Sequence, residues 1–295
     1  MKRFSYFVAL IELRTKLVSL ATFLAAFAWV WVSRKTINLP LAALFFATVL
    51  ALDMGTTAFN SFFDFWRGTD DADWNRERDK VLVHDRVAPG WALLAGLGCY
   101  AAAAFLGLFL AVLSTPWVLL FGVLGMIVGF AYTGGPWPIS RSPLGEVFAG
   151  GFLGGVLFGL VCFVLGGGLR YQDLLLCFPS AFLVASILTV NNTCDLRGDL
   201  ATGRRTLSGL LGPRLSSFLI LAEGGLAWGT LGYFTFSDRA GQVWVWGVGV
   251  VLSLWIYRGM LKRGFSHATK GPSMRSILSV LTLFTLTETL IFLFT

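Results

Sequence analysis

Two short stretches of this sequence carry Asn and Asp residues where a long apolar run meets a polar loop. They read Asn60-x3-Asp64-x5-Asp70 and Asn191-Asn192-x2-Asp195-x3-Asp199. Positions four apart share one face of a helix, so each stretch directs amide and carboxylate groups to one side. Asp70 reaches that side only if the chain turns back. Gly68 can end the helix in a left-handed backbone conformation and so allow this turn. Carboxylates in apolar surroundings are costly unless a cation needs them, so both stretches are candidate cation sites.

The ligand type in these stretches favours magnesium. Mg²⁺ prefers oxygen ligands, keeps several waters and usually bridges one or two carboxylates to substrate phosphates. We therefore predict Mg²⁺ as the cofactor, bound by Asp64, Asp70, Asp195 and Asp199. Paired carboxylate clusters of this kind can hold magnesium on a substrate diphosphate. The candidate ligands for such a diphosphate are the nearby amides and guanidinium groups: Asn60, Asn191, Asn192, Arg67, Arg197, Arg204 and Arg205. A solvated helix end explains one such stretch equally well, but it explains two with matching spacing poorly.

The composition indicates a polytopic membrane protein. Of 295 residues, 56% are hydrophobic and 13% are charged, whereas a soluble domain carries roughly a quarter charged residues. The 34 glycines suit close packing of transmembrane helices. The four cysteines form no CxxC pair, so we interpret them as small buried residues. The sequence thus predicts a single membrane domain over residues 1–295, in a lipid bilayer and without a nucleic-acid partner.

An all-α bundle of about nine transmembrane helices is expected, because a helix needs about 20 apolar residues to cross the bilayer. The candidate spans are 17–33, 39–63, 90–113, 115–132, 144–166, 173–194, 215–236, 241–257 and 276–294. The two Asn/Asp stretches follow the second and the sixth span. This spacing suggests two four-helix halves with an added ninth helix.

The distribution of positive charge predicts the orientation. With a cytoplasmic N-terminus, 19 of the 23 Lys and Arg residues fall in cytoplasmic segments and 4 in outer ones. Cytoplasmic loops of membrane proteins carry this excess. Both stretches then lie on the cytoplasmic face of the cell membrane. Residues 3–16 are expected to form an amphipathic interfacial helix rather than a signal peptide, because Glu12, Arg14 and Lys16 interrupt the apolar run.

Other polar and aromatic groups could contribute to the site. Asp53 lies two turns deeper than Asn60 on the same face, whereas Glu223 and Glu288 are as well explained by hydrogen bonds between helices. Asp71 and Asp73 are candidate outer metal ligands. Ring faces stabilise a positive charge without attacking it. The rings that could shield an allylic cation are those of Phe63, Phe65, Trp66 and Tyr132.

Three segments together resemble the UbiA superfamily of intramembrane aromatic prenyltransferases, and most closely its branch acting on 1,4-dihydroxy-2-naphthoate. They are Asn60-x3-Asp64-x3-Gly68-Thr69-Asp70, the Tyr132-Thr-Gly-Gly-Pro136-Trp-Pro loop ending in Pro143-Leu-Gly145-Glu146, and Asn191-Asn192-x2-Asp195-x3-Asp199-x3-Gly203-Arg204-Arg205. The nine-span layout extends the resemblance over nearly the whole chain. Two departures concern Ser61, where many relatives have a second Asp, and Pro136, which replaces the Lys of a Tyr-x3-Lys pattern.

The resemblance implies a helical bundle around a central cavity that opens sideways to lipid and, for its polar substrates, to the cytoplasm. It also implies Mg²⁺-dependent transfer of a polyprenyl group from its diphosphate to the naphthoate, with loss of carbon dioxide. Catalytic roles would fall to Asp64, Asp195, Arg67 and Tyr132. Arg141 and Glu146 are candidates for the region that binds the aromatic acceptor.

Two alternatives remain open from the sequence. The same reaction could use another acceptor, such as another quinone precursor, a haem or a lipid alcohol. A magnesium or small-molecule transporter is the other, because intramembrane Asp residues also mark ion routes. Against a transporter, both acidic stretches lie at the same side, with no acidic partner site at the outer ends of the spans. Prenyl chain length and oligomeric state cannot be read from the sequence.

Overall fold

The computed structural model describes residues 2–70 and 80–294, and these residues form helices without any strand. Within the described part of the chain, eight helices are long and apolar enough to cross a membrane, and Trp117–Thr133 is a shorter apolar helix of 17 residues. Each of the nine predicted spans coincides with one of these nine segments. The all-α, multi-pass membrane fold is therefore confirmed.

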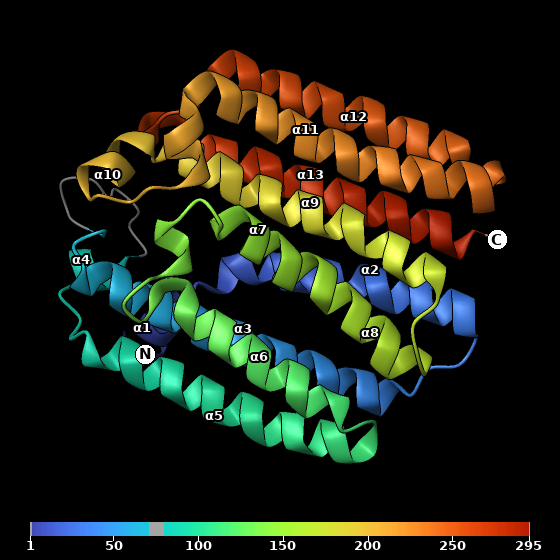
Figure 1. Ribbon diagram of the computed structural model, residues 1–295, viewed down its shortest axis with the longest axis horizontal. Coiled ribbons are helices and arrows are strands. Elements are labelled where there is room, and N and C mark those ends of the chain that lie inside the picture. Colours follow the sequence, from blue (N-terminus) through green and yellow to red (C-terminus); the bar gives the residue numbers. More distant parts are fainter. Residues whose placement is uncertain (1, 71–79, 295) are drawn as a thin grey trace. The chain divides into compact units, whose positions relative to one another are not determined.

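The principal helices follow the apolar runs closely (Figure 1). They are α2 Leu17–Arg34, α3 Leu39–Trp66, α5 Gly90–Leu113, α6 Trp117–Thr133, α9 Tyr171–Cys194, α11 Leu207–Asp238, α12 Val243–Arg263 and α13 Lys270–Leu293. One further span combines α7 Gly145–Ala149, the π-helix η3 Gly150–Val156 and α8 Leu157–Gly166. Helix α11 begins eight residues before the predicted span because it contains a break at Gly212, where φ is 74° and Pro213 follows.

The chain divides into two compact units that are discontinuous in sequence. Unit 1 comprises Met1–Leu17, Asn38–Ser142 and Ala201–Arg204, and unit 2 comprises Val18–Ile37, Pro143–Leu200 and Arg205–Thr295. Each Asn/Asp stretch therefore belongs to a different unit. The predicted single domain, its two four-helix halves and the central cavity stay predictions.

In unit 1, helix α3 packs along α5 and α6. Its Phe59 is buried, and the Phe59 ring meets the rings of Tyr100 and Phe130 edge-on, with centroids 4.9 and 5.4 Å away. A Cβ at Gly96 would lie 2.8 Å from the Phe59 ring, so the glycine makes room for it. This packing fixes the C-terminal half of α3, which carries the first Asn/Asp stretch.

In unit 2, helix α9 packs against α11, α13 and the π-helix η3. A Cβ at Gly154 would lie 2.5 Å from Ala181 Cα, so η3 and α9 approach at backbone distance. At the other end of α9, Asp173 is fully buried and accepts hydrogen bonds from Trp29 at 2.6 Å and from Arg34 at 2.7 Å. These contacts fix α9, which ends at the second Asn/Asp stretch.

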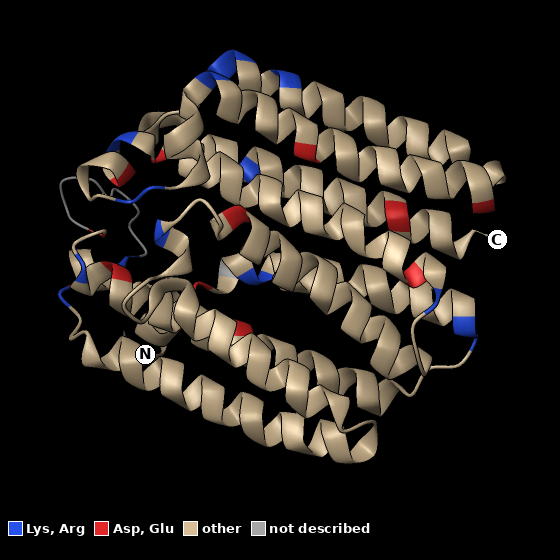
Figure 2. Ribbon diagram, in the orientation of Figure 1, with Lys and Arg blue, Asp and Glu red and all other residues tan. Residues whose placement is uncertain are grey.

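Charged residues are sparse along the long helices and are found mainly near helix ends and in connecting segments (Figure 2). The predicted interfacial helix over residues 3–16 is interrupted. Helix α1, Lys2–Leu10, ends before Glu12, which has a left-handed φ of 45°, and the short helix η1, Leu13–Lys16, follows. The break turns the Glu12 side chain toward Lys80, 2.9 Å away.

Candidate functional site

The first Asn/Asp stretch ends helix α3 in a glycine turn, as predicted. Gly68 has a φ of +66°. The Thr69 amide donates to the Asp64 carbonyl at 2.8 Å, and the Gly68 amide donates to the Phe65 carbonyl at 3.1 Å. This pair of bonds is the Schellman motif of a helix C-terminus. The Asp70 amide also donates to the Asp64 carbonyl, at 3.1 Å, so the chain returns Asp70 to the end of the helix that carries Asp64.

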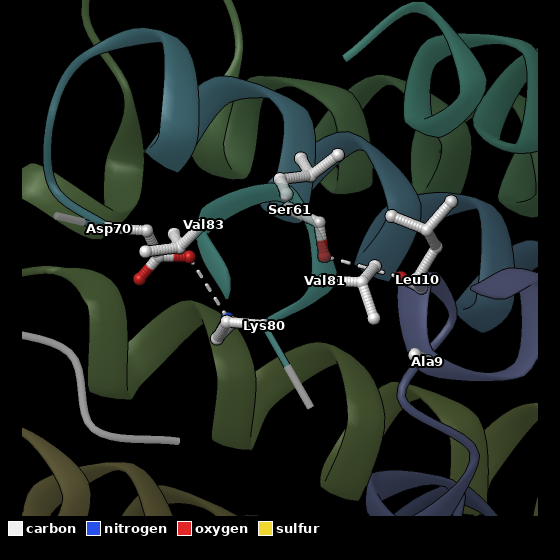
Figure 3. A pocket seen from close by; sticks show the side chains of 8 residues that line it. Ala9, Leu10, Ser61, Asp70, Lys80, Val81 and Val83 are labelled. Atoms are coloured by element: carbon white, nitrogen blue, oxygen red, sulfur yellow. Dashed lines mark hydrogen bonds and ion pairs between the residues drawn. The ribbon is translucent and has the colours of Figure 1, made fainter. Parts of the chain in front are cut away.

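Asp70 forms an ion pair that the sequence did not reveal. Its carboxylate lies 3.2 Å from the Lys80 ammonium (Figure 3). Lys80 also contacts Glu12 at 2.9 Å. Burial alone would lower the Lys80 pKa, but the two carboxylates outweigh it and raise the Lys80 pKa well above its usual range. Lys80 is therefore a fixed cation at the first stretch.

Asn60 and Arg67 attach the first stretch to the loop that follows Tyr132. The Thr133 hydroxyl donates to Asn60 Oδ1 at 2.6 Å. Arg67 donates to the carbonyl of Gly135 at 2.6 Å and to the carbonyl of Thr133, and its guanidinium lies 5.2 Å from the centroid of the Phe63 ring. In the structure these predicted substrate ligands hold the loop next to the stretch. Tyr132 is partly buried one residue before Thr133, at the end of α6.

Two further arginines of unit 1 connect the same loop to the segment after the second stretch. Arg141 ends the short helix η2, Ile139–Arg141, and donates to Thr69 Oγ1 at 3.1 Å and to the Thr202 carbonyl at 2.5 Å. Arg204 donates to the Ser140 carbonyl at 3.1 Å and also acts electrostatically on Asp64. Both predicted arginines thus lie around the first stretch, and Arg204 supplies positive charge to it.

The second Asn/Asp stretch keeps a helical hydrogen-bond pattern, as predicted. The Asp195 amide donates to the Asn191 carbonyl at 3.0 Å, and the Asp199 amide donates to the Asp195 carbonyl at 2.9 Å. Asp195 caps α9, and Asp199 lies in the short helix α10, Leu196–Ala201, where it is buried. The three residues therefore follow one another at one-turn intervals.

Asp195 is paired with two cationic or titratable groups that the sequence did not reveal. Its carboxylate lies 2.6 Å from the Lys270 ammonium and 3.5 Å from His267 Nδ1. Lys270 is the first residue of α13, and His267 begins the short helix η5, His267–Thr269. Seventy-five residues separate Lys270 from Asp195, so no local sequence signal could have indicated this pair.

The remaining predicted residues of unit 2 divide into buried and exposed groups. Asn192 is buried and donates to Glu146 Oε1 at 2.9 Å, so its amide contacts the buried Glu146 of helix α7. Arg197 and Arg205 are exposed. Their roles as diphosphate ligands stay predictions.

Two intramembrane acids, Asp53 in unit 1 and Glu223 in unit 2, have structural partners. Asp53 accepts from Lys16 at 2.6 Å, and Lys16 also contacts Thr57 at 2.5 Å. Glu223 accepts from Thr189 at 3.0 Å, which fits the predicted hydrogen bond between helices. Glu288 is almost completely buried, but neither of its carboxylate oxygens has a hydrogen-bond partner among the described residues, so the hydrogen bond predicted for Glu288 is not formed.

The oxygen ligands present in each unit suit a hard cation. Unit 1 offers Asp64, Asp70 and the Asn60 amide, and unit 2 offers Asp195 and Asp199, so the donor set is the one that Mg²⁺ prefers. Among residues 2–70 and 80–294, no three His, Cys, Asp or Glu side chains already form a metal cluster. The predicted outer ligands Asp71 and Asp73 lie outside the described residues.

Comparison with known proteins decides the family. The sequence profile of the UbiA prenyltransferase family matches residues 19–280. The chain belongs to the UbiA prenyltransferase family. A 1,4-dihydroxy-2-naphthoate octaprenyltransferase of Bacillus subtilis is 32% identical over 213 residues, which cover 72% of this chain and 62% of the relative. An enzyme with the same name from Mycobacterium tuberculosis is 31% identical over 172 residues, 58% of each chain.

Other UbiA family members are similar at lower coverage or in fold alone. Human UbiA prenyltransferase domain-containing protein 1 is 30% identical over 173 residues, 58% of this chain and 50% of the relative. A UbiA homolog from Archaeoglobus fulgidus bound to DMAPP and Mg²⁺ has a TM-score of 0.68 at 15% identity, over 98% of this chain and 99% of the other. The chain thus spans about half to two thirds of these curated relatives, while the solved UbiA fold covers it nearly end to end.

Proposed function

We propose that this membrane protein transfers a polyprenyl group from polyprenyl diphosphate to 1,4-dihydroxy-2-naphthoate and releases carbon dioxide, giving demethylmenaquinol. The observation that carries this proposal is the 32% identity to the Bacillus subtilis octaprenyltransferase, in a chain that retains both Asn/Asp stretches. The loop after Tyr132, which resembles the naphthoate branch, is hydrogen-bonded to the first of these stretches. The loop and the acidic groups are therefore parts of one local structure in unit 1.

Magnesium is the proposed cofactor, and structures of UbiA homologs that contain Mg²⁺ with a prenyl diphosphate support it. The proposed magnesium ligands are Asp64 and Asp70 in the first stretch, and Asp195 and Asp199 in the second. When bound, Mg²⁺ supplies positive charge that stabilises the leaving diphosphate. Binding the four carboxylates to metal also removes the repulsion they would exert on a diphosphate.

The residues of the chain bind and orient the donor. Arg204 already acts on Asp64 and can share its positive charge with phosphate oxygens. Arg197 and Arg205, exposed beside the second stretch, are proposed as further diphosphate ligands together with Asn191 and Asn192. Positive groups fixed before the reaction stabilise the negative charge that develops on the leaving group.

The proposed bond changes balance without an added base. The allylic C–O bond breaks and its electron pair leaves with the diphosphate. The ring carbon that carries the carboxylate then donates an electron pair to the allylic carbon, and the ring–carboxylate bond breaks to release carbon dioxide. The electron pair of the broken ring–carboxylate bond restores the aromatic ring. Because an ionised carboxylate leaves as carbon dioxide without a proton, no proton acceptor is needed.

Aromatic side chains near the first stretch would shield the allylic cation. Phe63 and Trp66 lie on the last turns of α3, and the Phe63 ring meets the Phe130 ring at 5.6 Å. Tyr132 follows Phe130 on α6, so its ring is the proposed contact to the acceptor side. Exclusion of water by these rings would favour attack by the naphthoate over hydrolysis.

A cytoplasmic N-terminus, with the site opening at the same side of the cell membrane, is proposed, and the excess of Lys and Arg in the predicted cytoplasmic segments supports it. A long polyprenyl tail then enters lipid, while the naphthoate and the diphosphate exchange with water. This orientation is testable, because a cysteine introduced at exposed Arg205 should react with an impermeant maleimide only in inside-out vesicles.

The experiment that tests the function uses the full chain in detergent with Mg²⁺, octaprenyl diphosphate and the naphthoate. Mass spectrometry should detect the prenylated, decarboxylated naphthoquinol together with released diphosphate. Equimolar 4-hydroxybenzoate and 1,4-dihydroxy-2-naphthoate in one reaction decide the acceptor. A product from the benzoate alone would contradict the naphthoate assignment, and cation uptake into liposomes without diphosphate release would favour a transporter.

A further inference from the structure

One carboxylate of each Asn/Asp stretch contacts a lysine that belongs to neither stretch. In unit 1, Asp70 lies 3.2 Å from Lys80. In unit 2, Asp195 lies 2.6 Å from Lys270. The two pairs are formed independently, by different elements in different units. The shared feature is an ammonium group placed on a proposed metal ligand.

Lys80 is fixed between two carboxylates. It precedes the short helix α4, Val81–His84, and its ammonium contacts Asp70 (Figure 3). The same ammonium contacts Glu12. The Lys80 side chain is 18% exposed and that of Asp70 is 12% exposed. Limited access to water strengthens the pair relative to one at the surface, so Lys80 competes effectively with other cations for Asp70.

Lys270 forms a comparable ion pair with Asp195. The ammonium contacts Oδ2 of Asp195, while Oδ1 of the same carboxylate faces His267. The side chains of Lys270 and Asp195 are 15% and 18% exposed. Both oxygens of Asp195 therefore face groups of the C-terminal region, and one of them already has a positive partner.

A metal ion and an ammonium group cannot use the same carboxylate oxygen at contact distance. Mg²⁺ needs its oxygen ligands at about 2.0–2.1 Å in near-octahedral geometry. Where the ion takes the oxygen that the ammonium contacts, the lysine must move away, and its lost attraction subtracts from the metal affinity. A dication that binds there replaces the positive charge that the displaced ammonium had supplied to the carboxylate.

We propose that Lys80 and Lys270 are internal counter-cations that occupy Asp70 and Asp195 in the metal-free protein and are displaced when magnesium binds. This inference rests on the proposed function, which assigns the metal to these carboxylates. Both lysines are positioning residues. They stabilise Asp70 and Asp195 before the substrate arrives and weaken the binding of metal without a diphosphate.

The first test measures the binding of Mn²⁺ alone to the full chain in detergent, by electron paramagnetic resonance. The Lys270→Met variant should bind Mn²⁺ at least threefold more tightly than the wild type, because the competing ammonium is absent. Lys270→Arg should retain wild-type affinity. The matched control is Lys262→Met, because Lys262 is exposed on α12 and the substitution should change nothing. Unchanged or weaker binding by Lys270→Met would overturn the proposal.

The second test needs no substitution and therefore does not depend on the folding of a variant. Acetic anhydride labelling of the wild type, read by mass spectrometry, should modify Lys80 and Lys270 at least threefold faster with saturating Mg²⁺ than without it. Lys262 serves as the internal reference. Rates that stay equal or fall with Mg²⁺ contradict displacement. If the wild type binds no Mn²⁺ even with inorganic diphosphate present, the metal assignment of the proposed function fails as well.

Discussion

The amide of Thr69 donates to the carbonyl of Asp64 at 2.8 Å, and this bond closes the turn that ends helix α3. Because Gly68 takes a φ of +66° in the turn, the chain reverses at once and Asp70 returns beside the helix end. A helix continuing past residue 68 would point Asp70 about 240° away from Asp64, as estimated from 3.6 residues per turn. The position of Asp70 beside the end of helix α3 therefore depends on one left-handed residue, Gly68.

Gly68→Ala should impair the site without a steric clash. Nothing lies within 4 Å of a Cβ at this position, so the expected cost is the left-handed backbone, about 1 kcal/mol. We expect a several-fold loss of turnover and weaker metal binding, with milder effects for Gly68→Asn. Gly98→Ala, in open space on helix α5, is the control. Full activity of Gly68→Ala would show that the turn is not needed.

Arg67 should act through the loop after Tyr132. Arg67→Met removes donors to the carbonyls of Thr133 and Gly135, and charged hydrogen bonds contribute about 1.5–3 kcal/mol each. We expect a lower unfolding temperature together with lower turnover. Arg67→Lys separates the two roles of this residue, because lysine keeps the charge but cannot reproduce both bonds. Recovery of turnover by Arg67→Lys without recovery of the unfolding temperature would favour a diphosphate contact over the loop contact.

The contributions of Lys16 and Asp53 to stability should depend on each other, because the two side chains form a buried ion pair. Their side chains are 6% and 10% exposed, so Lys16→Met leaves an uncompensated carboxylate and should cost about 3–5 kcal/mol of stability. The double variant Lys16→Met/Asp53→Leu should recover most of this loss. Thermal unfolding in detergent measures the cycle. Additive losses would mean that the two side chains do not depend on each other.

The π-helix η3 offers a matched pair of glycine substitutions. Gly154→Ala places a methyl group 2.5 Å from Ala181 Cα on α9, so the two helices must separate. Overpacking of this kind costs about 1–3 kcal/mol. Gly151→Ala, on the same π-helix, meets nothing within 4 Å and should leave the unfolding temperature nearly unchanged. Equal effects of the two substitutions would contradict the close approach of η3 and α9.

Features set by local chemistry could be predicted from the sequence. The nine apolar segments follow from hydrophobic length, and the turn at Gly68 follows from the left-handed preference of glycine. The prediction of one continuous interfacial helix over residues 3–16 was wrong at Glu12. The helix is interrupted there by a left-handed residue, and the Glu12 side chain forms an ion pair with Lys80. Partners of the carboxylates depend on tertiary contacts. Lys270 reaches Asp195 across 75 residues, and no periodicity in the sequence encodes that contact.

In the proposed function, the carboxylates of both stretches serve one diphosphate-releasing reaction. The most direct measurement is diphosphate release by full-length Asp64→Asn and Asp195→Asn variants, each folded as judged by its unfolding temperature, with Mg²⁺, octaprenyl diphosphate and the naphthoate. Asp238→Asn, an exposed position at the end of α11, is the control. Each site variant is expected to lose at least 100-fold of the wild-type rate, since removal of one electrostatic group costs about 10²–10³ in turnover. A near-full rate in either variant would contradict the account.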